Sequence, residues 1–159
     1  MLNNLTITTD LDICKFTLHD LPDRPGIAAE MFMRLGDAGI NVVMLATAGA
    51  ELGRTDISVT VGNDDVQKSA VVLETAKREL DAQGLSQKQD VAAISLIADG
   101  LAHAPGVAGR MFRTLSAEGI NIDMISAANT AVTCLIDLRF LAAASRALEK
   151  EFLGALAAR

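Results

Sequence analysis

The sequence has 159 residues, half of them apolar, and a formal net charge of −6. No run of about 18 uncharged apolar residues is present to span a bilayer, and an acidic chain without Trp or Tyr offers little to the backbone or bases of a nucleic acid. We therefore expect no membrane segment and no nucleic-acid partner, in a chain that can bury one sizeable core or two small ones.

Two strand patterns open the chain. Residues 5–9 (Leu-Thr-Ile-Thr-Thr) are suited to a strand, and residues 12–19 alternate apolar and polar side chains with the period of two that predicts a half-buried strand. A turn at 21–26 (Leu-Pro-Asp-Arg-Pro-Gly) follows. The apolar residues of 27–38 then recur at helical spacing, and Gly39 is the predicted C-cap.

Two further strands and a second helix come next. Residues 40–46 are apolar on both faces, so this strand is expected in the middle of a covered region. Residues 55–61 alternate and predict a third strand with one face in water. Asp64 and Gln67 resemble a capping box, which predicts a helix that runs to about residue 83 and stops at Gly84.

The same pattern recurs 80 residues further on without a gap. The repeated residues are Pro25-Gly26, Met31-Phe32, Leu35, Gly39-Ile40-Asn41 and Met44, matched by Pro105-Gly106, Met111-Phe112, Leu115, Gly119-Ile120-Asn121 and Met124. A repeat of this length is a whole supersecondary unit rather than a solenoid module of about 20–50 residues. The chain is therefore predicted to hold two similar small domains.

The second copy lacks a fourth strand of its own. Its predicted strands are 94–98, 120–127 and 132–138, and its predicted helices are 107–118 and 141–152. The hairpin turns at Asn129-Thr130 and is about five residues shorter than in the first copy. Because the last three residues (Ala-Ala-Arg) cannot form a strand, whereas 5–9 lies outside the first copy, we expect the N-terminal strand to complete the second sheet.

These elements predict an α+β fold. A βαββαβ unit gives a four-stranded antiparallel sheet with two helices packed on one face. We place the first unit at 10–90 and the second at 91–159 together with the strand 4–9. The borrowed strand would interlock the copies, so neither is expected to fold well alone.

The motifs resemble a known family. The order of strand, Pro-Asp-Arg-Pro-Gly turn, helix, Gly-Ile-Asn and apolar strand is similar to an ACT domain, a ferredoxin-like regulatory module of amino-acid metabolism. The more specific matches, to the tandem ACT region of aspartate kinases, are Leu21-Pro-Asp-Arg-Pro-Gly26, Gly39-Ile-Asn-Val-Val-Met44, Thr55-Asp-Ile-Ser58, Pro105-Gly-Val107 and Ile120-Asn-Ile-Asp-Met-Ile-Ser126. The resemblance covers nearly the whole chain. It implies the allosteric region of an aspartate kinase without the kinase domain, with lysine and/or threonine as effectors.

The turn before the first helix suits a free amino acid. The N–H groups of Gly26, Ile27 and Ala28, at the positive end of the helix dipole, could hold a carboxylate. Asp23 could accept hydrogen bonds from an ammonium group, and Asn41 offers an amide to the same ligand.

The same residues also have a purely structural interpretation. Asp23 would then cap the helix, Pro25 would occupy its first turn, and Gly26 would be present for close packing. Asn41 and Asn121 would only turn the chain into the following strand. Five methionines are better explained as core residues than as a binding surface: Met31, Met33, Met44, Met111 and Met124.

The two copies differ at the predicted site. Asp23 and Arg24 are matched by His103 and Ala104, so only the first copy has an acidic anchor for an amine. The resemblance implies an effector held between ACT units. Carried over to this chain, it indicates Asp23, Gly26 and Ala28 from the first loop, Asn121 and Ile122 from the second copy, and Thr47, where the family often has Gln. The chain also departs from the family at Val43, commonly acidic there, and at Ala127-Ala128, commonly hydroxylic.

The sequence marks no catalytic, metal-binding or cofactor-binding residues. It has no phosphate loop and no metal spacing from His19 and His103. Asp64-Asp65 is attributed to helix-capping charge. Cys14 and Cys134 lie far apart, and the first four residues lack a charged leader, so we expect buried, reduced thiols in a cytoplasmic protein.

The expected partners are a free amino acid, a second copy of the chain in a homodimer, and an aspartate kinase catalytic domain or subunit. One alternative is a free-standing tandem-ACT interaction protein, similar to the small subunit of acetolactate synthase or to a regulator of glycine metabolism. Another is a small enzyme on the same scaffold, for which His19, His103 and Asp23 would be the candidates.

Overall fold

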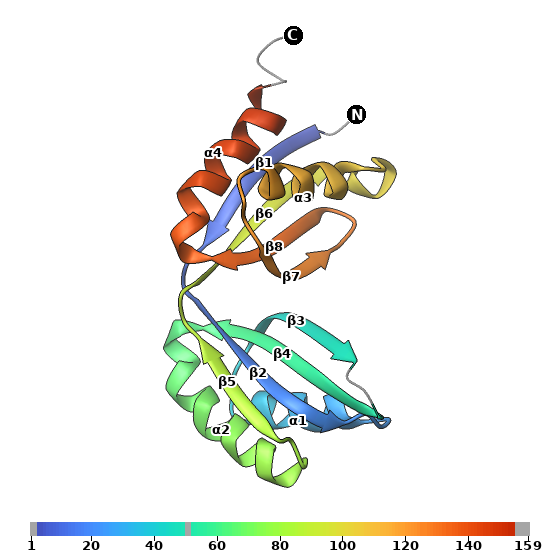
Figure 1. The fold of residues 1–159 in the computed structure, drawn as a ribbon, viewed down its shortest axis with the longest axis vertical. Helices are drawn as coiled ribbons and strands as arrows, with labels where there is room; N and C mark the ends of the chain where they lie inside the picture. The colour runs from blue at the N-terminus through green and yellow to red at the C-terminus, as the bar shows by residue number, and fades with distance from the viewer. Residues whose placement is uncertain (1–2, 50–51, 155–159) are drawn as a thin grey trace. The chain divides into compact units, whose positions relative to one another are not determined.

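The computed structural model describes residues 3–49 and 52–154. They belong to two compact units, each a four-stranded antiparallel sheet with two helices on one face (Figure 1). The first unit takes in residues 12–89, and the second combines the chain up to Leu11 with the chain from Asp90 onward. The predicted α+β class with two βαββαβ-like units is confirmed.

The first sheet has the strand order β3-β4-β2-β5. Its elements are β2 (Ile13–Pro22), α1 (Ile27–Asp37), β3 (Val42–Gly49), β4 (Arg54–Gly62), α2 (Val66–Glu79) and β5 (Gly84–Lys88). Alternate residues of the two central strands, such as Phe16 and Ile57, face the helices. They meet Met31 and Leu35 from α1 and Leu73 from α2 in one buried cluster.

The second sheet has the order β1-β6-β8-β7. Its elements are β1 (Asn3–Asp10), β6 (Val91–Asp99), α3 (Val107–Ala117), β7 (Ile122–Ala127), β8 (Ala131–Asp137) and α4 (Leu141–Phe152). As expected, the N-terminal strand completes this sheet: β1 pairs antiparallel with β6, and Ile7 lies opposite Leu96. Leu5 and Ile7 pack against the second core.

Only one of the two sheets contains a strand from a distant part of the chain. All four strands of the first sheet come from the continuous stretch 12–89, whereas the second sheet needs a strand from the other end of the chain. The borrowed strand therefore gives a structural reason to expect poor independent folding for the second unit only. Only the second unit depends on a distant segment.

Strand β3 lies at an edge of its sheet, not in the middle of a covered region. Val43 and Leu45 are 50% and 47% exposed. Apolar residues on both faces of a strand predict that both faces are buried, but the pattern does not identify the elements that bury them. Here the unit's own helices leave these two side chains exposed.

The second helix of the first unit is shorter than predicted. It ends at Glu79 because Asp81 takes a left-handed backbone conformation with φ of +57°, and the chain then enters β5 at Gly84, a strand that the sequence pattern does not mark. The capping box is also absent. Asp64 belongs to a short 3-10 turn, and Asp65 caps α2 without a side-chain hydrogen bond, pairing instead with Lys68 at 3.0 Å.

Both cysteines are free and buried, as predicted. Desolvation raises the pKa of the Cys134 thiol to about 12. Within 3–49 and 52–154, no helix combines the length and the apolar character that crossing a membrane would require.

Candidate functional site

Gly26 shapes the start of helix α1. It precedes the helix with a φ of +92°, and a Cβ atom built there would meet nothing within 4 Å. Glycine is therefore favoured at this position by the left-handed backbone conformation and not by close packing. No side chain caps this helix end, so the structural interpretation is wrong for both Asp23 and Gly26.

A pocket of about 440 Å³ lies between the start of α1 and the facing ends of β3 and β4. Its volume is within the usual range for small-molecule sites. The lining residues are Asp23, Arg24, Gly26, Ile27, Ala28, Ala29, Thr47, Gly49, Thr55 and Ile57. Five of the eight predicted effector residues are among them: Asp23, Gly26, Ile27, Ala28 and Thr47.

The two charged residues described in the lining of the pocket, Arg24 and Asp23, differ in whether they have an ion-pair partner. Arg24 Nη1 lies 2.7 Å from Glu30 Oε1, and this pair keeps the pKa of Glu30 below its usual value. Asp23 is exposed, and its carboxylate makes no hydrogen bond or ion pair within the described part of the chain. Asp23 therefore presents an uncompensated negative charge beside the positive end of the α1 dipole.

The backbone donors differ from expectation at one residue. The N–H of Ile27 donates to the Arg24 carbonyl at 3.2 Å, so it is not available to a ligand. The N–H groups of Gly26 and Ala28 donate to no backbone carbonyl among the described residues. Two donors of the predicted three remain to hold a carboxylate.

Asn41 does not join this pocket. It lies after the C-terminal end of α1, which is roughly 16 Å long, whereas the pocket lies at the N-terminal end. One small ligand cannot contact Gly26 and Asn41 of the same unit. Asn121, which is exposed, and Ile122, which packs against the second core, lie at the start of β7 in the second unit.

The second copy is built differently before its helix. His103 is exposed and belongs to a 3-10 turn, Leu101–His103. Gly106 has a φ of +88°, close to that of Gly26. The helix start is thus repeated, but the acidic side chain before it is not.

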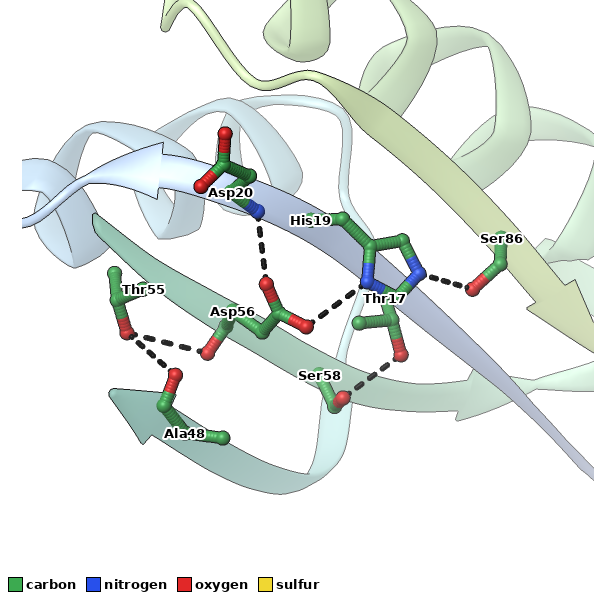
Figure 2. A network of polar contacts seen from close by, with 8 residues as sticks. All are labelled: Thr17, His19, Asp20, Ala48, Thr55, Asp56, Ser58 and Ser86. Atoms are coloured by element: carbon green, nitrogen blue, oxygen red, sulfur yellow. Dashed lines mark hydrogen bonds and ion pairs between the residues drawn. The ribbon is translucent and has the colours of Figure 1, made fainter. Parts of the chain in front are cut away.

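A polar network that the sequence analysis missed lies on the sheet face opposite α1 and α2 (Figure 2). His19 Nδ1 is 2.9 Å from Asp56 Oδ2, and His19 Nε2 is 2.8 Å from Ser86 Oγ. Since an ionised carboxylate only accepts, Nδ1 donates to Asp56, and in the tautomer with its single proton on Nδ1, Nε2 accepts from Ser86. His19 is on β2, one of the two central strands of this sheet.

Asp56 also accepts a hydrogen bond from the backbone N–H of Asp20 at 2.8 Å. This bond and the one from His19 lower the pKa of the Asp56 carboxyl. Alternation along the strands could have placed His19 and Asp56 on one face. Their contact depends on the register of β2 against β4, which the sequence does not show.

Replacing Asp56 by alanine is expected to destabilise the first unit at neutral pH by about 1 kcal/mol, the usual net value of a lost hydrogen bond. Because the folded-state pKa of Asp56 is lowered, its contribution is present above the unfolded value near 3.9 and is lost as the pH falls through the folded value. Urea unfolding of both proteins from about pH 5 to 2.5 measures this difference. A difference that did not shrink below about pH 4 would contradict the assignment.

A protein-family model described as ACT domain matches residues 19–76 and 94–152. The two matched segments fall one in each unit, and each contains the glycine that precedes the first helix of its unit.

Individual proteins give a more specific likeness. The aspartokinase of Thermus thermophilus is 32% identical over 148 residues, and the aspartate kinase of Pseudomonas putida is 32% identical over 146. In both cases 92% of this chain is covered but only 36% of the relative, so the chain spans about a third of the length of the curated relatives it matches.

A solved structure matches over nearly its full length. The regulatory subunit of aspartate kinase from Thermus thermophilus, in a ligand-free form, superposes with a TM-score of 0.87 at 32% identity. The match covers 92% of this chain and 96% of that subunit. The tandem arrangement predicted from the repeat therefore has a close structural counterpart.

Proposed function

This chain belongs to the ACT-domain family, and on that premise we propose that it is an allosteric regulatory module of aspartate-kinase type that binds a free amino acid. The observation that carries the proposal is the pocket at the start of α1. It brings an uncompensated carboxylate, two available backbone N–H groups and a hydroxyl-bearing wall together in a molecule similar to a regulatory subunit.

The pocket matches the two charged groups of an amino acid. In this proposal the N–H groups of Gly26 and Ala28 bind the α-carboxylate and Asp23 binds the α-ammonium group, because all three residues line the pocket and both N–H groups lack a backbone acceptor among the described residues. The ligand side chain would then face Thr47, Thr55 and Ile57.

The charge balance favours threonine over lysine. Asp23 is the acidic residue among the described residues that line the pocket, and Glu30 is engaged by Arg24. Once Asp23 holds the α-ammonium group, a second ammonium group in the side chain of lysine meets no further carboxylate among the described lining residues. A small hydroxyl-bearing side chain instead finds Thr47 and Thr55 as hydrogen-bonding partners.

Regulation would work by differential binding. An effector that binds one arrangement of the ACT units more tightly than another stabilises that arrangement, and typical coupling free energies are about 1–3 kcal/mol. The partner receiving this signal would be an aspartate kinase catalytic domain or subunit in the cytoplasm, which gives feedback control of an amino-acid pathway. Asn121 and Ile122 stay candidates for contacts from a second ACT unit.

A dimer is part of the proposal. Strand β3 presents an unpaired edge with Val43 and Leu45 exposed, and such edges pair readily with another chain. A two-fold contact of this kind would bury apolar side chains that the first unit leaves in water.

Calorimetric titration of the purified chain tests the proposal. Threonine, lysine, methionine and the branched-chain amino acids are titrated separately, and light scattering follows the oligomeric state. Threonine is expected to bind, and lysine at least about tenfold more weakly. If no amino acid gives heat or changes the oligomeric state, the effector function is wrong.

A further inference from the structure

The backbone at Asp20 is held in an unfavourable conformation. The pairing of β2 with β4 shifts register between Leu18 and Leu21, and Asp20, inside this irregularity, has a φ of +55°. The corresponding residue of the second copy is Gly100, with a φ of +83°. Left-handed geometry is open to glycine but costs other residues free energy, so the first copy is strained where the second is not.

Two side chains of β4 hold Asp20 by its backbone. Asp56 Oδ1 accepts from its N–H at 2.8 Å, and Arg54 Nη2 donates to its carbonyl oxygen. Arg54 Nε also lies 3.4 Å from Asp20 Oδ2. We call Arg54 and Asp56 the Asp20 clamp. Both main-chain polar groups that the irregular pairing frees are thereby satisfied.

The clamp is itself well anchored. Figure 2 shows Asp56 between Asp20 and His19, with His19 held in turn by Ser86 of β5. Arg54 donates to the carbonyl oxygen of Asp81, beyond the end of α2, at 2.8 Å and pairs with its carboxylate at 3.2 Å. The side chains that hold Asp20 are therefore fixed by two other parts of the unit.

The clamp adjoins the proposed effector pocket. Asp23 follows Asp20 by three residues, and its N–H donates at 2.8 Å to the carbonyl of Gly53, next to Arg54. Thr55, between the two clamp residues, lines the pocket and donates to the Ala48 carbonyl at 3.2 Å. The clamp thus connects the turn that carries Asp23 to the β4 wall of the pocket.

We propose that Arg54 and Asp56 are positioning residues for the effector site: by holding Asp20 in its left-handed conformation, they direct the following turn so that Asp23 faces the pocket. This inference rests on the proposed function. A comparison of the two copies supports the inference. The second copy has glycine at the position of Asp20, and it has no acidic residue at the position of Asp23 that would have to be directed toward a ligand.

A rescue experiment on the full chain tests the clamp. Asp56→Ala and Arg54→Ala are each expected to weaken threonine binding about tenfold in calorimetry. Adding Asp20→Gly to Asp56→Ala should restore the affinity to within about threefold of the starting protein, because glycine adopts the required φ without help. If Asp56 acted only through its contact with His19, Asp20→Gly would not restore the affinity.

Arg34→Ala is the matched control. Arg34 pairs with Glu79 at 2.8 Å between α1 and α2, so this variant loses an arginine ion pair outside the clamp and should keep its affinity. Clamp variants that are folded and bind threonine as the starting protein does, or an Asp20→Gly change that fails to restore binding, would overturn the inference.

A second measurement does not need the ligand. Hydrogen exchange at residues 20–28 is expected to be faster in Asp56→Ala than in the starting protein, with residues 100–108 unchanged as an internal reference. Equal exchange at 20–28 would contradict the clamp. If the starting protein binds no amino acid but exchange at 20–28 does increase, the clamp stands and the proposed effector function fails.

Discussion

Replacing Asp23 by asparagine is expected to weaken effector binding by about 10- to 100-fold. The carboxylate of Asp23 is exposed, and the described residues give it no cation to neutralise it, so an incoming ammonium group would form a new charge-assisted hydrogen bond. Hydrogen bonds to charged groups contribute about 1.5–3 kcal/mol, which corresponds to this range of affinity. Calorimetric titration with threonine measures the loss.

The internal repeat supplies the controls for this result. His103→Asn changes the equivalent position of the second copy and should leave the affinity unchanged. Gly26→Ala and Gly106→Ala, at φ of +92° and +88°, should each cost about 1–2 kcal/mol of stability, but only Gly26→Ala should weaken binding. Equal binding by Asp23→Asn and the starting protein would exclude Asp23 as the ammonium anchor.

Deleting residues 1–11 is expected to unfold the second unit and leave the first unit folded. The deletion removes β1, exposes the backbone edge of β6 and takes Leu5 and Ile7 out of the second core. We expect a loss of about 4 kcal/mol, against a total stability of roughly 4–12 kcal/mol for a domain of this size. Two-dimensional amide NMR spectra should then show dispersed signals for residues 12–89 only.

The matched experiment expresses residues 12–89 alone. That segment contains every strand of its sheet, so it is expected to give the same dispersed spectrum as in the truncated chain. A second unit that stayed folded without β1 would show that the strand only covers the edge of a sheet that is already stable.

Local patterns predicted most of the fold. The helix at 141–152 was predicted with the bounds that α4 has, because its apolar residues follow the helical period without interruption. Strand β5 was missed, since Gly84–Lys88 has little apolar alternation and is stabilised by pairing with β2. The position of β3 at an edge was missed for a related reason: the order of strands is a property of the whole sheet.

For the candidate site, too, local sequence could group some residues and not others. Asp23, Gly26, Ile27 and Ala28 are close in sequence, and a helix start brings such residues together wherever it forms. Thr47, which lines the pocket, was predicted from family resemblance and not from spacing. Asn41 was misplaced because the sequence position before a strand does not show which end of the unit that strand begins at. The network of His19, Asp56 and Ser86 joins three strands and leaves no local signal.

The sequence by itself determined the repeat, the fold class, the extra N-terminal strand and the acidic residue that only one copy carries, since each follows from residue type and spacing along a short segment. Only the tertiary structure decided which strands lie at edges, that the first unit is complete in itself, and that Arg54 and Asp56 hold a strained Asp20. These contacts join residues more than 30 positions apart, and the register of paired strands that creates them is set by the packing of the whole sheet against its helices.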